Sequence, residues 1–289
     1  RLNAPATETD SRVLDAIDDL AAPTAQLGDY RAAYELIREA LSVRERTQPP
    51  DTEKILAQKQ HLGQILVQLH DLEAAHKLQA EVLEQLAANP NRNTHLYVTG
   101  LQYFARILHG QHDDEAAYKA IVEAIALLRE LGAPYQRDLG TARGLLGVLE
   151  RARGNLGASR VALEAGYEGL VGCLARDHNF VQVACSELIS TRRLQRDIPR
   201  ALELTLAQLE NAVASLQQSN LAARQTARLV TIQKYGIDQA LNLALDDVDA
   251  PTRRALAARV LSVSQMLRGA ATQRARRANA RHAARAEQL

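Results

Sequence analysis

Four residues with potential metal-ligand or acid–base chemistry, His109, His112, Asp113 and Asp114, lie within six positions of one another. Histidine nitrogens and carboxylate oxygens are common ligands of zinc and other transition metals. Two histidines on either side of a turn seldom complete a metal site alone, and Asp113 also belongs to a repeating turn position described below. We therefore expect a structural role for this group, with no metal and no cofactor.

Other arrangements of reactive residues give no catalytic signature. The chain has no glycine-rich phosphate loop, no nucleophile elbow and no HExxH spacing. No Ser, His and carboxylate set lies in a sequence context that supports a triad. We expect no catalytic residues in this chain and no enzymatic activity.

The C-terminal residues form a basic segment. Residues 268–289 contain six arginines and one acidic residue, Glu287. A helix over residues 270–289 would place Arg274, Arg277, Arg281 and Arg285 along one basic stripe, because they are spaced i, i+3, i+7 and i+11. Such a stripe could attach to RNA, to an acidic partner or to an anionic membrane. The alternative is a solvated capping helix, and the absence of Trp and Phe anchors argues against insertion into a membrane.

The elements that carry these residues repeat with a period of 42. Small residues recur at this interval, each four positions after an Asp or Asn: Ala33, Ala75, Ala117, Ser159 and Ala201 follow Asp29, Asp71, Asp113, Asn155 and Asp197. A period held over about five copies predicts stacked structural units that bury their faces against each other.

Each unit is expected to be a pair of helices. The first helix carries a large residue beside a small one, as at Leu62-Gly63, and the Asp or Asn then caps the second helix. Apolar or small residues follow the cap at i, i+4 and i+7 spacing, as at Ala33, Ile37 and Ala40. Prolines at Pro49-Pro50, Pro90 and Pro134 separate the units, and Pro23 is expected to end the first helix early.

Composition agrees with an all-α protein. Aromatic residues make up 3% of the chain, and good helix formers dominate. The formal net charge is +1, with the basic residues gathered at the C-terminus, so a nucleic-acid role for the repeats themselves is not expected. No apolar run approaches the roughly 20 residues that would span a bilayer. The chain opens at Arg1 without an initiator or a secretion signal, which suggests a piece of a larger protein.

Two local features have more than one interpretation. Cys173 and Cys185 lie on either side of an expected loop near Asn179; we favour two buried thiols over a disulfide bridge. Eight of the fifteen glycines fall between Gly140 and Gly172, including Gly166, Gly169 and Gly172 in one expected helix. They indicate either a hinge or close helix packing.

These repeats resemble the tetratricopeptide repeat, in the 42-residue form of kinesin light chains and many bacterial signalling proteins. The resemblance rests on residues 40–46, Pro50-Asp51 and Leu62-Gly63, and it extends over about residues 10–240. It implies a right-handed α-α superhelix of about five to six helix pairs. The expected division is a flexible segment at 1–9, repeats at 10–48, 51–89, 94–132, 136–176, 179–218 and 221–246, a capping helix at 251–269 and a tail at 270–289.

The resemblance also implies where ligands bind. In this family they lie in a concave groove lined by the first helix of each pair. Carried over by register, the groove residues are Gln60, Gln64, Gln68, Gln102, Arg106, His109, Arg151, Ser186, Ser190 and Arg193. This polar, mildly basic surface would suit an extended peptide with an acidic residue or a free carboxylate. The alternative is that these residues are ordinary solvated positions of amphipathic helices.

We expect a non-catalytic protein-interaction or sensor domain, part of a larger bacterial signalling protein, that binds a peptide or protein segment. One alternative is a scaffold that self-associates as a homo-oligomer, with its groove filled by its own tail. Another is binding of RNA or an acidic partner through the arginine-rich tail. Cysteine usage favours the cytoplasm, and the alternative is an extracytoplasmic part of a membrane-anchored signalling protein.

Overall fold

The computed structural model describes residues 14, 16–17, 20–25, 27–46, 51–218, 254, 258, 261 and 265. All regular secondary structure in these residues is helical, which confirms the all-α prediction. The elements are α2 (Tyr30–Arg44), α3 (Thr52–Gln68), α4 (Leu72–Ala88), α5 (Thr94–Gly110), α6 (Asp114–Leu131), the 3₁₀ helix η1 (Ala133–Tyr135), α7 (Gln136–Ala152), α8 (Leu156–Val171), α9 (Asn179–Leu194) and α10 (Ile198–Gln218).

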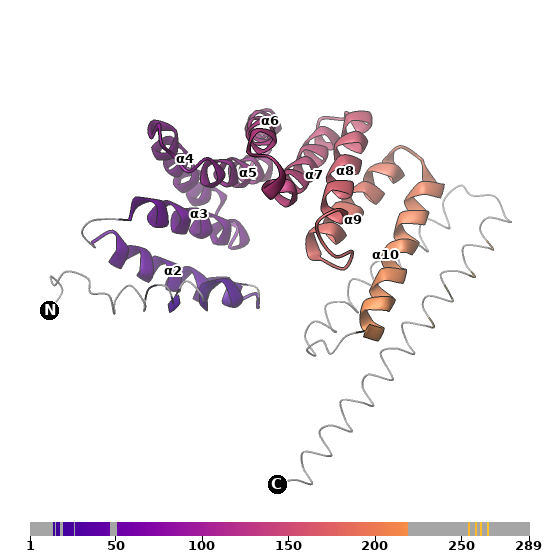
Figure 1. Ribbon diagram of the computed structural model, residues 1–289, viewed down its shortest axis with the longest axis horizontal. Helices are drawn as coiled ribbons and strands as arrows, with labels where there is room; N and C mark the ends of the chain where they lie inside the picture. Colours follow the sequence, from indigo (N-terminus) through magenta and orange to yellow (C-terminus); the bar gives the residue numbers. More distant parts are fainter. Residues whose placement is uncertain are drawn as a thin grey trace, which may run out of the picture. The chain divides into compact units, whose positions relative to one another are not determined.

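The chain divides into two compact units, which are considered separately below. Unit 1 comprises Arg1–Arg153 and unit 2 comprises Gly154–Leu289. In unit 1 each helix from α2 to α7 packs on the next, and α3 also contacts α5 (Figure 1). In unit 2, α9 packs on both α8 and α10. Consecutive packing of this kind is typical of a repeat protein, in which each helix pair contacts its neighbours.

The small residues of the 42-residue period lie in the core. Ala33, Ala75, Ala117, Ser159 and Ala201 are all 0% exposed. Residues four and seven positions later are also buried, as at Ile37 and Ala40. A small side chain lets two helices approach closely, so these positions set the spacing between helices. The expected burial of this face of each second helix is confirmed.

Each turn between paired helices has the same backbone geometry. The residue before the Asp or Asn has a positive φ at Gly28 (87°), His70 (64°), His112 (65°), Gly154 (83°) and Arg196 (60°). At the turns before α2, α4, α6 and α10 the next amide bonds back into the preceding helix, as from Asp71 N to Leu66 O at 2.9 Å. This left-handed residue and its backward hydrogen bond form a Schellman-type helix end.

The expected side-chain caps are present at the turns before α2, α4 and α6. One carboxylate oxygen of Asp29, Asp71 and Asp113 accepts a hydrogen bond from an amide three residues later, at 3.0 to 3.1 Å. Asn155 precedes α8 without such a capping bond, so the prediction is wrong there. Asp197, before α10, pairs with the guanidinium of Arg192.

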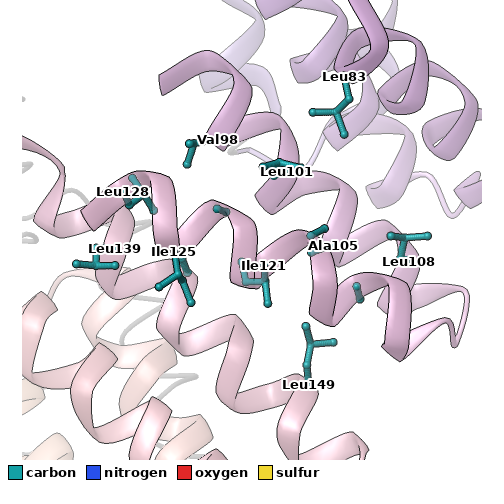
Figure 2. Packing of buried hydrophobic residues seen from close by; sticks show 14 residues of the cluster. Leu83, Val98, Leu101, Ala105, Leu108, Ile121, Ile125, Leu128, Leu139 and Leu149 are labelled. Atoms are coloured by element: carbon teal, nitrogen blue, oxygen red, sulfur yellow. The ribbon is translucent and has the colours of Figure 1, made fainter. Parts of the chain in front are cut away.

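The largest described core cluster belongs to unit 1 and joins α4, α5, α6 and α7. Figure 2 shows the inward side chains of α5 and α6 facing each other, with Leu83 of α4 and Leu149 of α7 on either side. Ile121 and Leu149 are each 0% exposed. Full burial of such a side chain contributes about 2 to 3 kcal/mol, so packing between neighbouring pairs stabilises the unit strongly.

Three local predictions differ from the structure. Pro23 does not end the first helix, because residues 20–25 are helical and Pro23 O accepts a hydrogen bond from Leu27 N at 3.0 Å. A proline lacks an amide donor, but its carbonyl can still accept a hydrogen bond from the next turn. Gly172 is the C-cap of α8 and not an interior residue. Cys173 is exposed, whereas Cys185 is buried, and both thiols are free.

Several predicted segments fall outside the described residues: the segment 1–9, the last repeat at 221–246, and the tail with Arg274, Arg277, Arg281 and Arg285. Of the expected capping helix at 251–269, the structure describes four helical and exposed residues, 254, 258, 261 and 265. Among the described helices, none combines the length and apolarity that crossing a bilayer requires. The hinge proposed for the glycine-rich region stays a prediction.

Candidate functional site

The first helices of successive pairs in unit 1, α3, α5 and α7, share a partly exposed face. Its positions follow i, i+3, i+7 and i+10 spacing, which keeps side chains on one side of a helix. We call it the helix-A face: Lys54, Ala57, His61 and Gln64 on α3; Leu96, Thr99, Tyr103 and Arg106 on α5; Asp138, Thr141, Leu145 and Val148 on α7. All of these side chains are exposed or half-buried. A surface of this kind is where a ligand can reach several helices at once.

A depression of about 490 Å³ lies on this face between the N-terminal halves of α3 and α5. The α3 side contributes its cap and the first three turns, and the α5 side contributes its cap and the first two turns. The lining residues are Asp51, Glu53, Lys54, Ala57, Gln60, His61, Asn93, His95, Leu96 and Thr99. We call it the α3–α5 depression.

Gln60, one of the predicted groove residues, is only 1% exposed. Its Nε2 donates a hydrogen bond to the carbonyl oxygen of Leu96 at 2.9 Å and so joins α3 to α5. The prediction treated Gln60 as an open surface residue, but its partner carbonyl lies 36 residues away in the next repeat. The side chain belongs mainly to helix packing, and it reaches the surface only in the wall of the depression.

Gln64 and Arg106, also predicted, each interact with Tyr103. Burial raises the pKa of the Tyr103 phenol, while the charge of Arg106 and a side-chain hydrogen bond with Gln64 act in the opposite direction. Arg106 itself is exposed. It makes no ion pair with any residue that the structure describes. An exposed guanidinium beside a phenol and an amide offers hydrogen-bond donors to an incoming carboxylate.

Two polar contacts link α5 to α7 on the same face. In the first, His95 Nε2 lies 2.9 Å from Asp138 Oδ2, while within α7 Arg137 Nε lies 3.2 Å from the other oxygen of the same carboxylate. The predicted groove residue Gln102 accepts a hydrogen bond from Thr141 Oγ1 at 3.3 Å. Gln102 is therefore already engaged between two repeats.

The other predicted residues of unit 1 lie near helix ends. His109 Nδ1 is 2.5 Å from Asp114 Oδ1, which ties the end of α5 to the start of α6. Gln68 is exposed in the last turn of α3, and Arg151 is half-buried in the last turn of α7. Among the described residues, no three His, Cys, Asp or Glu side chains are grouped so that they could hold a metal ion.

The predicted residues of unit 2 lie on α9. Ser190 Oγ donates to Ser186 O at 2.9 Å, and Gln208 Nε2 of α10 donates to Ser186 Oγ at 3.2 Å, so Ser186 takes part in packing. Arg193 is exposed. Two apolar side chains of α9, Phe180 and Val183, are 38% and 52% exposed. In the 42-residue register they are equivalent to Asp138 and Thr141 of α7.

Sequence reasoning missed His61, His95, Thr99 and Tyr103, which all lie on or beside the helix-A face. The available signal was the register itself: His61, Tyr103 and Leu145 are 42 residues apart, as are Ala57, Thr99 and Thr141. Applying this register to all residue types on the face, and not only to Gln and Arg, would have identified them.

No known protein family matches the sequence, and no curated protein matches it either. Solved structures do match. A kinesin light chain-like protein of Podosopora anserina with nearly identical TPR-like repeats is 19% identical, over 71% of this chain and 97% of that one, with a TM-score of 0.55. BtubC (BKLC) from P. vanneervenii is 14% identical over 90% and 91%, with a TM-score of 0.56. A Rap protein complexed with Competence and Sporulation Factor is 10% identical over 91% and 82%, with a TM-score of 0.58. At these identities the likeness establishes the fold alone.

Proposed function

Because the chain has the fold of the TPR-like repeat proteins, we propose that it is a non-catalytic interaction or regulatory domain whose helix-A face binds an extended peptide or protein segment. The observation that carries the proposal is the group formed by Gln64, Tyr103 and Arg106. It joins two successive repeats on one accessible face, and its guanidinium is exposed.

The chemistry of this group favours a segment with a carboxylate. A guanidinium can grip a carboxylate through two parallel hydrogen bonds, and an amide such as Gln64 can pair with main-chain groups of an extended peptide. A solved Rap protein with a similar fold is complexed with Competence and Sporulation Factor. This precedent supports a binding role, and the residues above give the proposed location.

The experiment is a peptide-array screen against the 289-residue chain, repeated with Arg106→Glu. We expect selective loss of captured acidic peptides, because the substitution places a carboxylate against a carboxylate. Arg38→Glu is the matched control, since Arg38 is an exposed arginine on α2, away from the helix-A face. Capture that is equally reduced by both variants, or by neither, would contradict the proposal.

Arg193→Glu tests the α9 face of unit 2 separately, with the same screen. The tail is tested by deleting residues 270–289. Peptide capture that appears only after this deletion would indicate that the tail competes for the face, as expected for the self-filled scaffold. Binding of RNA that the deletion abolishes would indicate a nucleic-acid role for the tail.

A further inference from the structure

The buried amide of Gln79 on α4 is hydrogen-bonded at one end only within the part of the chain that the structure describes. The side chain is 0% exposed, and its Nε2 donates to Gly100 O on α5 at 3.1 Å. Because a carbonyl oxygen can only accept, this bond fixes which end of the amide faces α5. The other end, Oε1, meets no donor among the described residues. An unpaired acceptor in the core destabilises the fold unless an ordered water supplies the missing bond.

The amide at this position is particular to one repeat. In the 42-residue register the equivalent residues are Ile37, Ile121, Leu163 and Thr205, and all four are buried. Three of them are apolar, and the Thr205 hydroxyl donates to the backbone of its own helix at 2.8 Å. None of these side chains brings an unpaired carbonyl oxygen into the core. The group that pairs with Gln79 Oε1 must therefore be held by the immediate surroundings of Gln79.

Gly63 on α3 leaves room beside this oxygen. Gly63 is itself buried, and α3 packs on α4. A β-carbon added at Gly63 would have one described atom of another element within 4 Å, Gln79 Oε1 at 3.5 Å. Gly100 differs, because a β-carbon there would lie 2.7 to 3.0 Å from three side-chain atoms. The core is thus closely packed at Gly100 and open at Gly63, on the side where the unpaired oxygen lies.

We propose that the space between Gly63 and Gln79 is a binding site for one internal water molecule, which donates a hydrogen bond to Gln79 Oε1. Its second hydrogen bond goes to a main-chain carbonyl of the α3 turn that Gly63 leaves uncovered, since such a carbonyl keeps one lone pair beside its helical bond. The water then joins α3 to α4, as the Gln79 amide joins α4 to α5. The site belongs to the core of unit 1 and is independent of the proposed peptide binding.

The first test is NMR detection of the water in the deuterated, ¹⁵N-labelled 289-residue chain. A long-lived internal water gives cross-relaxation peaks with nearby protons, here those of the Gln79 side-chain amide. We expect such a peak in the parent protein and its loss in Gly63→Ser, where the serine hydroxyl takes the place of the water. Ala105→Ser is the matched control and should keep the peak, because Ala105 is the equivalent of Gly63 and its equivalent partner is the apolar Ile121. Absence of the peak from the parent, or its persistence in Gly63→Ser, would overturn the site.

Stability gives a second readout, from Gly63→Ser and Gly63→Ala. Alanine normally stabilises a helix more than serine, and we expect this order at position 105, between the parent and Ala105→Ser. At position 63 we expect the reverse, because serine donates a hydrogen bond to Oε1, whereas alanine displaces the water and leaves the oxygen unpaired. The unfolding equilibrium constant from urea denaturation should be about two- to tenfold smaller for Gly63→Ser than for Gly63→Ala. Equal constants, or alanine more stable than serine at both positions, would show that Oε1 needs no donor and would overturn the proposal.

Discussion

The side-chain amide of Gln79 on α4 donates a hydrogen bond to the carbonyl oxygen of Gly100 on α5, over 3.1 Å, in a position where Gln79 is fully buried. Gln60 reaches the same place from α3. A β-carbon added at Gly100 would lie 2.7 Å from Gln60 Nε2, 2.9 Å from Leu83 Cδ2 and 3.0 Å from Gln79 Nε2. Two buried glutamines therefore depend on the absence of a side chain at one glycine.

Gly100→Ala is expected to lower the free energy of unfolding by about 1 to 2 kcal/mol, because three packed side chains must move. Gly144→Ala on α7 is the matched control. Its added β-carbon would meet nothing within 4 Å, so the better helix propensity of alanine should stabilise by about 0.5 to 1 kcal/mol. Urea denaturation of both variants measures the difference. If Gly100→Ala stabilised the protein as much as Gly144→Ala, the close packing around Gly100 would be contradicted.

His112→Gly is expected to raise the free energy of unfolding by about 0.5 to 1 kcal/mol. His112 is exposed and has a φ of 65°, a conformation that glycine adopts without steric cost. The reciprocal change Gly154→Ala, at a φ of 83°, should destabilise by about 1 kcal/mol. Thermal unfolding followed by circular dichroism gives both values. The prediction fails unless His112→Gly raises the free energy of unfolding and Gly154→Ala lowers it.

The stability of unit 2 is expected to fall at high pH because of Cys185. Burial raises the pKa of the Cys185 thiol from 9.0 to about 12. Between those values the unfolded chain releases a proton that the folded chain keeps, so the free energy of unfolding decreases as the pH rises. The slope contributed by this thiol is at most about 1.4 kcal/mol per pH unit. Urea midpoints at several pH values between 9 and 12 for the parent and for Cys185→Ala measure it. A parent slope no steeper than that of the variant would refute the prediction.

The two thiols are expected to react at different rates. Cys173 is exposed, whereas Cys185 is 4% exposed. A thiol reagent such as iodoacetamide should modify Cys173 in the folded protein and Cys185 only after local or global unfolding. Mass spectrometry of peptides from the treated protein distinguishes the two sites. Equal modification of both under native conditions would mean that the α8–α9 packing opens readily.

The sequence predicted the repeat and its turns well because both depend on local chemistry. The 42-residue period marked Ala33 and Ala117 as core residues, and an Asp before a helix is a strong cap. Prediction from the sequence failed where the burial of a side chain depends on a partner far away along the chain. Gln60 was predicted as surface, since nothing near it in the sequence shows that Leu96 O would accept its amide. The same limit applies to Gln102, whose partner is Thr141.

The candidate site was predicted only in part. Gln64 and Arg106 were chosen for their hydrogen-bonding types, but Tyr103, with which each interacts, was not. A tyrosine in a helix is usually counted as core, and its half-buried position depends on how α3 and α5 pack. Its role beside Arg106 could not be deduced from type or spacing without that packing.

The positive φ that recurs at the five described turns between paired helices has a consequence for protein engineering. Gly28, His70, His112, Gly154 and Arg196 differ in side chain but share one backbone conformation at one register. A 42-residue block that begins and ends at two successive turns therefore has the same backbone conformation at both ends. Each block also carries one small buried residue at the same position, so neighbouring blocks are equivalent in the core. Such a block can be deleted or duplicated without changing the turn that connects it to its neighbours. The number of repeats, and with it the number of adjacent helix-A faces, can therefore be set by design.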